Sequence, residues 1–495
     1  MKRIIALLLV LVMVAVCAVS CKDTESQVNE LDKQSVIDKY GLPDKEYTDY
    51  NGYEYTILTV GSLGGDHWSA YEFVYDSGVT GDALNEAVME RDNAVSALHN
   101  IKINYIEKEG LTDYARRSIL SGSQEFDLVT DSLGGAGSLA RDGMLINLKD
   151  YDDVMNLEAE YWDQRAIQSL DINGHLFFTP SNLTLIDKQA TWVVFFTKSM
   201  MVKYPDLLGD DYASLYEMVE KGDWTIERMY NMVKSVSLDN GDGVWTNEDV
   251  YGHFGEGFSV NSLMIGCGAS CIEKTTTGEY EYVLNDNTDD LVRCYALVDE
   301  IVKSDYSMTS GEMAAYVTDV WVDGAGSMME KERVLFNLTG MNRCRLFRNL
   351  EADFGILPMP KASEKQDGYH MLMTGFANCV SIPISAEDKV RSCEILENLT
   401  FIADKTTYHA YIEQSLKGKY LRDDGSEAML DIIFNSRRYD IGDIFGGFGA
   451  SGIVGAITSP EAVASFIKKQ ESRCTKTLDK LLDDMESIFE KTARK

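Results

Sequence analysis

Aromatic and carboxylate side chains stand where expected strands end, and these residue types could bind a hydroxylated solute. The chain contains 6 Trp and 26 Tyr. A neutral sugar offers apolar C–H faces to aromatic rings and hydroxyl groups to carboxylates and amides. The candidates are Trp68 after the first expected strand, Asp131 and Ser132 after the third, and Trp321 before a glycine-rich turn at 324–326. The alternative for each is an ordinary buried aromatic ring or a helix-capping residue.

A polar loop at 238–249 matches part of an EF-hand calcium loop. Its ligand positions three, five, nine and twelve hold Asn240, Asp242, Thr246 and Asp249. The first position, where a carboxylate belongs, holds Leu238, and the last has Asp in place of a bidentate Glu. Both departures weaken calcium binding, so the sequence favours an Asx-rich turn without metal and leaves calcium as the alternative. We expect no other cofactor.

The sequence lacks the common catalytic motifs, so we expect that the protein is not an enzyme. There is no Gly-x-Ser-x-Gly, no His-Glu-x-x-His, and the 6 His residues are scattered. The glycines at 135–137 imitate a dinucleotide-binding turn but follow the third expected strand instead of the first. A glycosidase needs only two carboxylates, which 80 acidic residues do not exclude. A secreted glycoside hydrolase therefore stays an alternative.

The first 20 residues predict a signal peptide. Lys2 and Arg3 precede an apolar run at 4–16 that is too short to span a bilayer. The segment 18–21, Ala-Val-Ser-Cys, resembles a lipobox, whose cysteine is acylated, which makes Cys21 the expected lipid anchor on the extracellular face of the membrane. Ala18 stands where a larger aliphatic residue is usual, so ordinary cleavage and free secretion is the alternative.

Charge and cysteine content narrow the choice of partners. The chain has 46 Lys and Arg against 80 Asp and Glu, a formal net charge of -34. Such a field repels phosphates, which argues against nucleic acid and anionic membrane surfaces as partners. The seven Cys residues after Cys21 follow no disulfide framework, and we expect most of them to be buried small hydrophobic residues.

Strand and helix patterns alternate along most of the chain, after a polar stretch at 21–51 that we expect to be a flexible tether. The first expected elements are a strand at 53–60, a helix at 82–99 and strands at 101–106 and 126–130. This alternation predicts βαβ units and a mainly parallel sheet. Ligands of such sheets bind beyond the carboxyl ends of the strands.

Several sequence blocks, in their order and spacing, resemble the family 1 extracellular solute-binding proteins of ABC importers over nearly the whole mature chain. They include Phe-Asp-Leu-Val at 126–129, Gly-Asp-Trp-Thr at 222–225 and Gly-Ile-Leu-Pro-Met-Pro at 355–360. One departure is Thr-Lys-Ser-Met at 197–200, where the family has Asn-Lys-Asp-Leu.

The resemblance implies a type II periplasmic-binding-protein-like α/β fold with two lobes that close about a hinge. We place lobe one at 52–182 plus 376–425 and lobe two at 183–375 plus 426–495. The resemblance then puts Trp192 beyond the first crossing between lobes and Phe376 at the second. It implies a monomeric receptor that captures a small polar solute, a sugar or oligosaccharide, and delivers it to ABC permease subunits. A peptide-binding surface lipoprotein is a further alternative.

Overall fold

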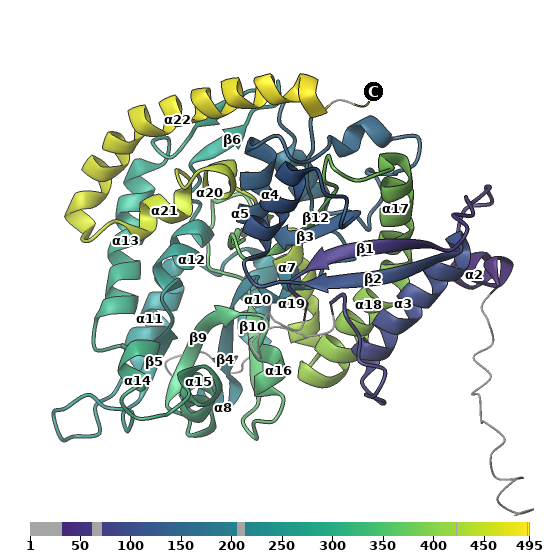
Figure 1. Cartoon of the computed structure of the whole chain (residues 1–495). Coiled ribbons are helices and arrows are strands. Elements are labelled where there is room, and N and C mark those ends of the chain that lie inside the picture. Colours follow the sequence, from purple (N-terminus) through teal and green to yellow (C-terminus); the bar gives the residue numbers. More distant parts are fainter. Residues whose placement is uncertain (1–31, 62–71, 205–212, 422, 493, 495) are drawn as a thin grey trace, which may run out of the picture.

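Two separate β-sheets divide the protein into two lobes (Figure 1). The computed structural model describes residues 32–61, 72–204, 213–421, 423–492 and 494, without the side chains of residues 321, 322 and 419. The lobe-one sheet has the order β12-β3-β1-β2. Its strands are β1 (Tyr53–Thr59), β2 (Ile101–Glu107), β3 (Leu128–Ser132) and β12 (Asn378–Ser381). The first three are parallel, and β12 runs antiparallel to β3.

The lobe-two sheet has the order β10-β4-β9-β5-β8. Its strands are β4 (Trp192–Thr197), β5 (Tyr251–Gly255), β8 (Ser307–Thr309), β9 (Val334–Gly340) and β10 (Phe354–Leu357). Strand β5 pairs in parallel with β8 and β9, whereas β4 runs antiparallel to β9 and β10. Every residue of β4 and β9 is buried, because helices cover both faces of the sheet. The α/β class predicted from the sequence is thus confirmed.

Helices pack around both sheets. Those of lobe one are α3 (Ala83–His99), α4 (Leu111–Ser121), α5 (Leu133–Arg141), α6 (Gln164–Leu170) and α17 (Lys389–Lys405). Those of lobe two are α8 (Lys198–Lys203), α10 (Ala213–Lys221), α11 (Ile226–Val236), α12 (Ser259–Gly266), α13 (Thr288–Lys303), α14 (Ser310–Met313), α15 (Ala325–Glu330), α16 (Arg343–Phe347) and α19 (Asp424–Asn435). Among the described residues, no helix is long and apolar enough to cross a membrane.

Part of the expected tether is folded. Residues Lys33–Tyr40 form helix α2, which Asp32 caps by accepting a hydrogen bond from the amide of Ser35. The helix packs on α3, and the Tyr40 hydroxyl donates to Glu90 of α3 at 2.7 Å. The expectation of a flexible tether is therefore wrong for residues 33–51. Two buried residues one helical turn apart, Val36 and Tyr40, give this polar segment enough apolar surface to dock.

The C-terminal helix α22 (Val463–Thr492) touches both lobes instead of belonging to the second alone. It packs against α13 of lobe two and α5 of lobe one. Near its end, the Phe489 ring stacks on His175 with centroids 3.6 Å apart, and Arg494 pairs with Asp153 of lobe one at 2.6 Å. The short helices α20 (Ile441–Phe445) and α21 (Ala450–Gly455) likewise divide their contacts, α20 with α5 and α21 with α12.

Two chain segments that cross between the lobes pair with each other at the hinge. Strand β11 (Met371–Leu372) lies parallel to β13 (Arg437–Arg438), and the first crossing carries the short helix α7 (Ile186–Gln189). The remaining elements are the hairpin of β6 (Ile272–Lys274) and β7 (Tyr280–Tyr282), helix α18 (Thr407–His409), two π-helical segments at Val320–Gly324 and Ala410–Tyr420, and two 3-10 segments at Leu148–Tyr151 and Pro460–Ala462.

A buried group of charges joins these crossings. The Arg437 guanidinium lies 2.9 Å from Asp187 of α7 and 2.6 Å from Asp163 of lobe one. Lys188 pairs with Asp187 at 2.9 Å and donates to the carbonyl of Ser181 at 2.6 Å. Since the four charged side chains are almost completely buried, each depends on its partners for the solvation that water would supply.

We predict that Arg437→Met strongly destabilises the fold. The change leaves Asp163 and Asp187 buried without their shared cation, which should lower the free energy of unfolding by about 3–5 kcal/mol. Urea unfolding followed by circular dichroism measures this loss. The matched control is Lys480→Met, which breaks an exposed pair with Asp484 and should change stability by no more than ~0.5 kcal/mol. Equal effects of the two variants would contradict the role of the hinge charges.

Candidate functional site

Aromatic side chains gather at one end of the lobe-two sheet. Trp192 begins β4 and lies opposite Gly340, the last residue of β9. Phe258 follows the carboxyl end of β5, the strand on the other side of β9. The two rings meet edge to face, with centroids 6.0 Å apart and an interplanar angle of 69°. Trp192 is buried, whereas Phe258 is 40% exposed, so this pair presents an apolar ring to solvent at the strand ends.

A charged pair stands at the same strand ends. The Glu256 carboxylate, next after β5, accepts a hydrogen bond from the Thr339 hydroxyl at 2.7 Å and lies 3.5 Å from the guanidinium of Arg343. Burial lowers the pKa of Arg343, and the neighbouring Glu256 opposes that shift. Sequence inspection did not single out Glu256 or Arg343, because a lone Glu and a lone Arg carry no spacing signal.

Asp131 and Ser132 lie at the carboxyl end of β3, as the sequence predicted, but their side chains already have partners inside lobe one. The Asp131 carboxylate accepts from the Thr112 hydroxyl at 2.6 Å and from the Ser132 amide at 2.7 Å, and burial raises its pKa. The Ser132 hydroxyl caps α5 by accepting from the amide of Gly135. A Cβ at Gly135 would lie 2.4 Å from the Asp131 carboxylate, so only glycine fits there. These contacts favour the capping alternative for Ser132.

Phe376 is an exposed aromatic residue at the strand ends of lobe one. It is 64% exposed and stands two residues before β12. The backbone on either side of it is fixed, because Gly134 donates to the carbonyl of Gly375 and Leu133 donates to that of Ala377. The structure thus brings Phe376 beside Asp131 and Ser132. Trp68 and the side chain of Trp321 lie outside the described residues. Their roles stay predictions.

The buried carboxylate of Glu72 links the first chain crossing to the start of β12, and the sequence analysis did not identify it. Glu72 is 4% exposed and accepts hydrogen bonds from the amides of Leu185 and Ile186, at 2.7 and 3.3 Å. Its second oxygen accepts from the side-chain amide of Asn378 at 2.9 Å. Burial raises the pKa of Glu72 to about 7. Glu72 therefore holds the chain after 62–71 against the first crossing and the start of β12.

Comparison with solved structures fits this two-lobed architecture. An ABC substrate-binding protein from Listeria monocytogenes aligns with a TM-score of 0.52 at 13% identity, covering 86% of this chain and 99% of its own. A lacto-N-biose-binding protein of an ABC transporter from Bifidobacterium longum gives 0.52 at 10% identity, with coverages of 88% and 98%. A solute-binding protein from Thermotoga lettingae gives 0.51 at 12%, with coverages of 88% and 100%.

The chain has the fold of ABC-transporter solute-binding proteins. No protein-family model matches it, and neither does any curated protein. At 10–13% sequence identity, this similarity shows the fold alone. The three neighbours are described as binding proteins, not as enzymes.

The EF-hand-like loop of this solute-binding fold is organised by its own backbone. The buried Asp249 carboxylate accepts from the amides of Asn240 at 2.8 Å and Thr246 at 2.6 Å, while Asn240 accepts from the amide of Asp242 at 3.1 Å. N–H groups therefore occupy the carboxylate oxygens that calcium would need, which favours the Asx-rich turn. Among the described residues, no group of three or more His, Cys, Asp and Glu side chains could hold a metal ion.

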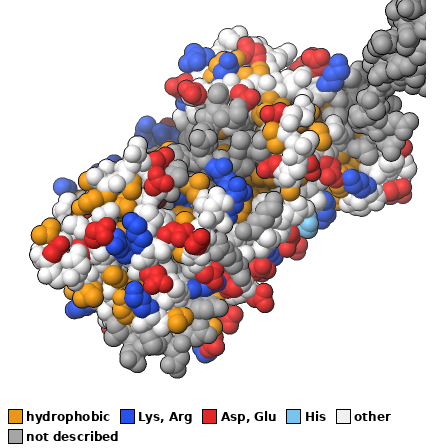
Figure 2. Space-filling view, turned by 90° about the horizontal axis from the view of Figure 1, so that it is seen from below, with side chains coloured by type: hydrophobic (Ala, Val, Ile, Leu, Met, Phe, Trp, Pro, Cys, Tyr) orange, Lys and Arg blue, Asp and Glu red, His pale blue; other side chains and the backbone are white. Residues whose placement is uncertain are grey.

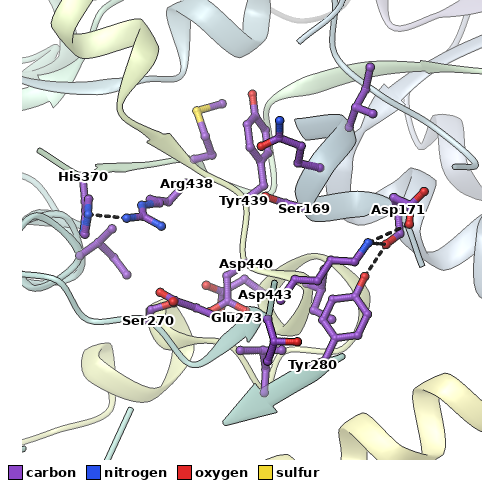
Figure 3. Close-up of a pocket in the computed structure, with 18 of the residues that line it drawn as sticks. Ser169, Asp171, Ser270, Glu273, Tyr280, His370, Arg438, Tyr439, Asp440 and Asp443 are labelled. Atoms are coloured by element: carbon purple, nitrogen blue, oxygen red, sulfur yellow. Dashed lines mark hydrogen bonds and ion pairs between the residues drawn. The ribbon is translucent and has the colours of Figure 1, made fainter. Parts of the chain in front are cut away.

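A hollow between the lobes lies at the hinge strands. This cavity of about 590 Å³ is walled by α6 of lobe one, the β6–β7 hairpin of lobe two and β13 (Figure 3). On one side Lys149 and Lys274 share the carboxylate of Asp171, and on the other Arg438 contacts His370. The aromatic residues of the strand ends are not among its described walls.

The face of the molecule seen from below mixes charges of both signs. In Figure 2, acidic and basic side chains alternate over this face, and hydrophobic ones occur in small groups. Among the described residues of this face, the basic side chains form no broad patch of the kind that binds phosphate backbones.

We predict that Glu72 makes stability fall with rising pH. Its pKa is about 7 in the folded protein and ordinarily 4.5, so the folded state holds more protons between these values. The free energy of unfolding should therefore fall from about pH 4.5 to about pH 7, by ~3 kcal/mol from this group, and stay level above.

Glu72→Gln should abolish this contribution, because the amide has no proton to lose in that range. Urea unfolding of wild type and variant at pH 5, 6, 7 and 8 gives the difference between them. The exposed Glu54→Gln is the control, for which the difference from wild type should stay constant. Parallel pH curves for wild type and Glu72→Gln would contradict the prediction.

Proposed function

We propose that this protein captures a small polar solute, a sugar or oligosaccharide, between its lobes and delivers it to the permease of an ABC importer. The observation that carries the proposal is the two-lobed fold with an exposed aromatic residue at the strand ends of each lobe, Phe258 and Phe376. The neighbours support the solute class: they are described in complex with cycloalternan, with α-D-tagatose and with lacto-N-biose.

The strand-end residues have the chemistry that sugar recognition needs. The Phe258 ring, backed by Trp192, can stack on the C–H face of a sugar ring. The Glu256 carboxylate and the Arg343 guanidinium beside it can accept from and donate to hydroxyl groups. Phe376 supplies a further ring from lobe one. A solute that contacts both lobes would favour the closed arrangement, because it binds that arrangement better than the open one.

We predict saturable binding of a saccharide without turnover. Tryptophan fluorescence against a panel of mono- and oligosaccharides, peptides and amino acids should identify the solute class, and mass spectrometry should find the bound saccharide unchanged. Phe376→Ala should raise the Kd by about tenfold or more, because one stacking face is lost. It should fold normally, since Phe376 is largely exposed.

Trp245→Phe is the control for that experiment, because Trp245 packs on Tyr251 away from the strand ends and its loss should leave the Kd unchanged. Hydrolysis of a glycan would instead support the glycoside hydrolase. Saturation by peptides alone would support the peptide-binding lipoprotein.

We further propose that the protein is exported and held at the outer face of the membrane by acylation of Cys21. This residue and the leader lie outside the described residues, so the proposal rests on the sequence pattern. Cells fed radiolabelled palmitate should label the wild type and not Cys21→Ala, with Cys393→Ala as a labelled control. An unlabelled wild type found in the medium would establish free secretion instead.

A further inference from the structure

Two buried cysteines share one backbone carbonyl. Cys271 lies immediately before β6, and Cys474 lies within α22, which passes over the β6–β7 hairpin (Figure 1). The Cys271 thiol donates to the Phe448 carbonyl oxygen at 3.1 Å, and the Cys474 thiol donates to the same oxygen at 3.4 Å. Because both sulfur atoms contact a single atom, they are close neighbours although 203 positions separate them in the chain.

The local packing keeps these sulfur atoms together. Cys271 and Cys474 are 0% and 1% exposed, and the Tyr282 hydroxyl of the adjoining β7 donates to the carbonyl of Ile467 in α22. The contact between the two thiols lowers the pKa of Cys474 and raises that of Cys271. Cys474 is therefore the thiol of the pair that ionises more readily.

The other cysteines offer a comparison. Burial raises the pKa of Cys344 and of Cys393, neither of which contacts another cysteine among the described residues. Burial, followed by a contact with Cys294, raises the pKa of Cys267. Cys267 and Cys294 thus form a second neighbouring pair, but among the described residues no shared acceptor atom fixes their sulfur atoms.

We propose that Cys271 and Cys474 form a reversible disulfide that fastens α22 to the β6–β7 hairpin of lobe two. The oxidant is a disulfide of low molecular weight or of a thiol oxidoreductase. The Cys474 thiolate attacks this disulfide, forms a mixed disulfide and releases one thiol. The Cys271 thiolate then attacks the Cys474 sulfur and releases the second thiol. The protein loses two protons and two electrons, and the oxidant is reduced to two thiols.

This bond would bias how the lobes move, which goes beyond solute capture. Helix α22 contacts lobe two near Cys474 and lobe one near its end, at Phe489 and Arg494. Once the disulfide fixes α22 to lobe two, opening of the lobes must break or slide the contacts that the end of the helix makes with lobe one. The redox state of the pair thus determines whether α22 separates from lobe one or from lobe two when the lobes open.

The test counts thiols in the full-length protein. One sample is equilibrated with oxidised glutathione and one with dithiothreitol, and both are then alkylated with iodoacetamide in denaturant and weighed intact. The oxidised sample should carry two fewer alkyl groups, and a tryptic digest should contain one linked pair of peptides, with Cys271 and Cys474. Thermal unfolding of the oxidised sample should show a Tm higher by ~4 °C, as closing a long loop constrains the unfolded chain.

Cys474→Ala should abolish both the missing alkyl groups and the redox dependence of Tm, whereas Cys393→Ala, a single buried cysteine of α17, should retain both. Equal alkylation of the two wild-type samples would overturn the proposal even if a variant failed to fold. A linked peptide pair of Cys267 with Cys294 alone would overturn it as well.

Discussion

The hinge depends on the buried Arg437 guanidinium. Arg437 lies in the last part of the sequence, whereas its partners Asp163 and Asp187 belong to lobe one and to the first crossing. Charges this deeply buried are stable only when each keeps its partner, so the arrangement fixes which segments may cross between lobes and in what register. Glu72 adds a third buried carboxylate at the same place and holds the crossings side by side. These contacts contribute to the relative position of both sheets and of the strand ends that carry the candidate site.

The sequence patterns that describe local structure were reliable. The segment 101–106 was predicted as a strand, and β2 spans Ile101–Glu107. The alternation of strands and helices correctly gave an α/β fold, and Asp131 and Ser132 do stand at a carboxyl strand end. In each case the signal lies within about ten neighbouring residues, where periodicity reports which side faces the core.

Contacts made over long sequence distances were not foreseeable in the same way. No sequence pattern near Glu72 indicates that its carboxylate accepts hydrogen bonds from backbone amides more than a hundred residues away. Likewise, Arg437 has no spacing relation to Asp163. The side chain of Asp131 illustrates a related limit, because its position was predictable but its use by Thr112 depends on how α4 packs. Helix α2 escaped notice because its two buried residues give too short a periodic signal.

The docking of α2 on α3 has a consequence for where the protein can work. Helix α2 begins at Lys33, and about eleven residues separate it from Cys21. Eleven residues, even when drawn out fully, reach no more than ~40 Å. If Cys21 is acylated, α2 therefore stays within ~40 Å of the bilayer. Such confinement raises the local concentration of the protein at any membrane protein that shares the surface, so the proposed delivery would need little intrinsic affinity between the two.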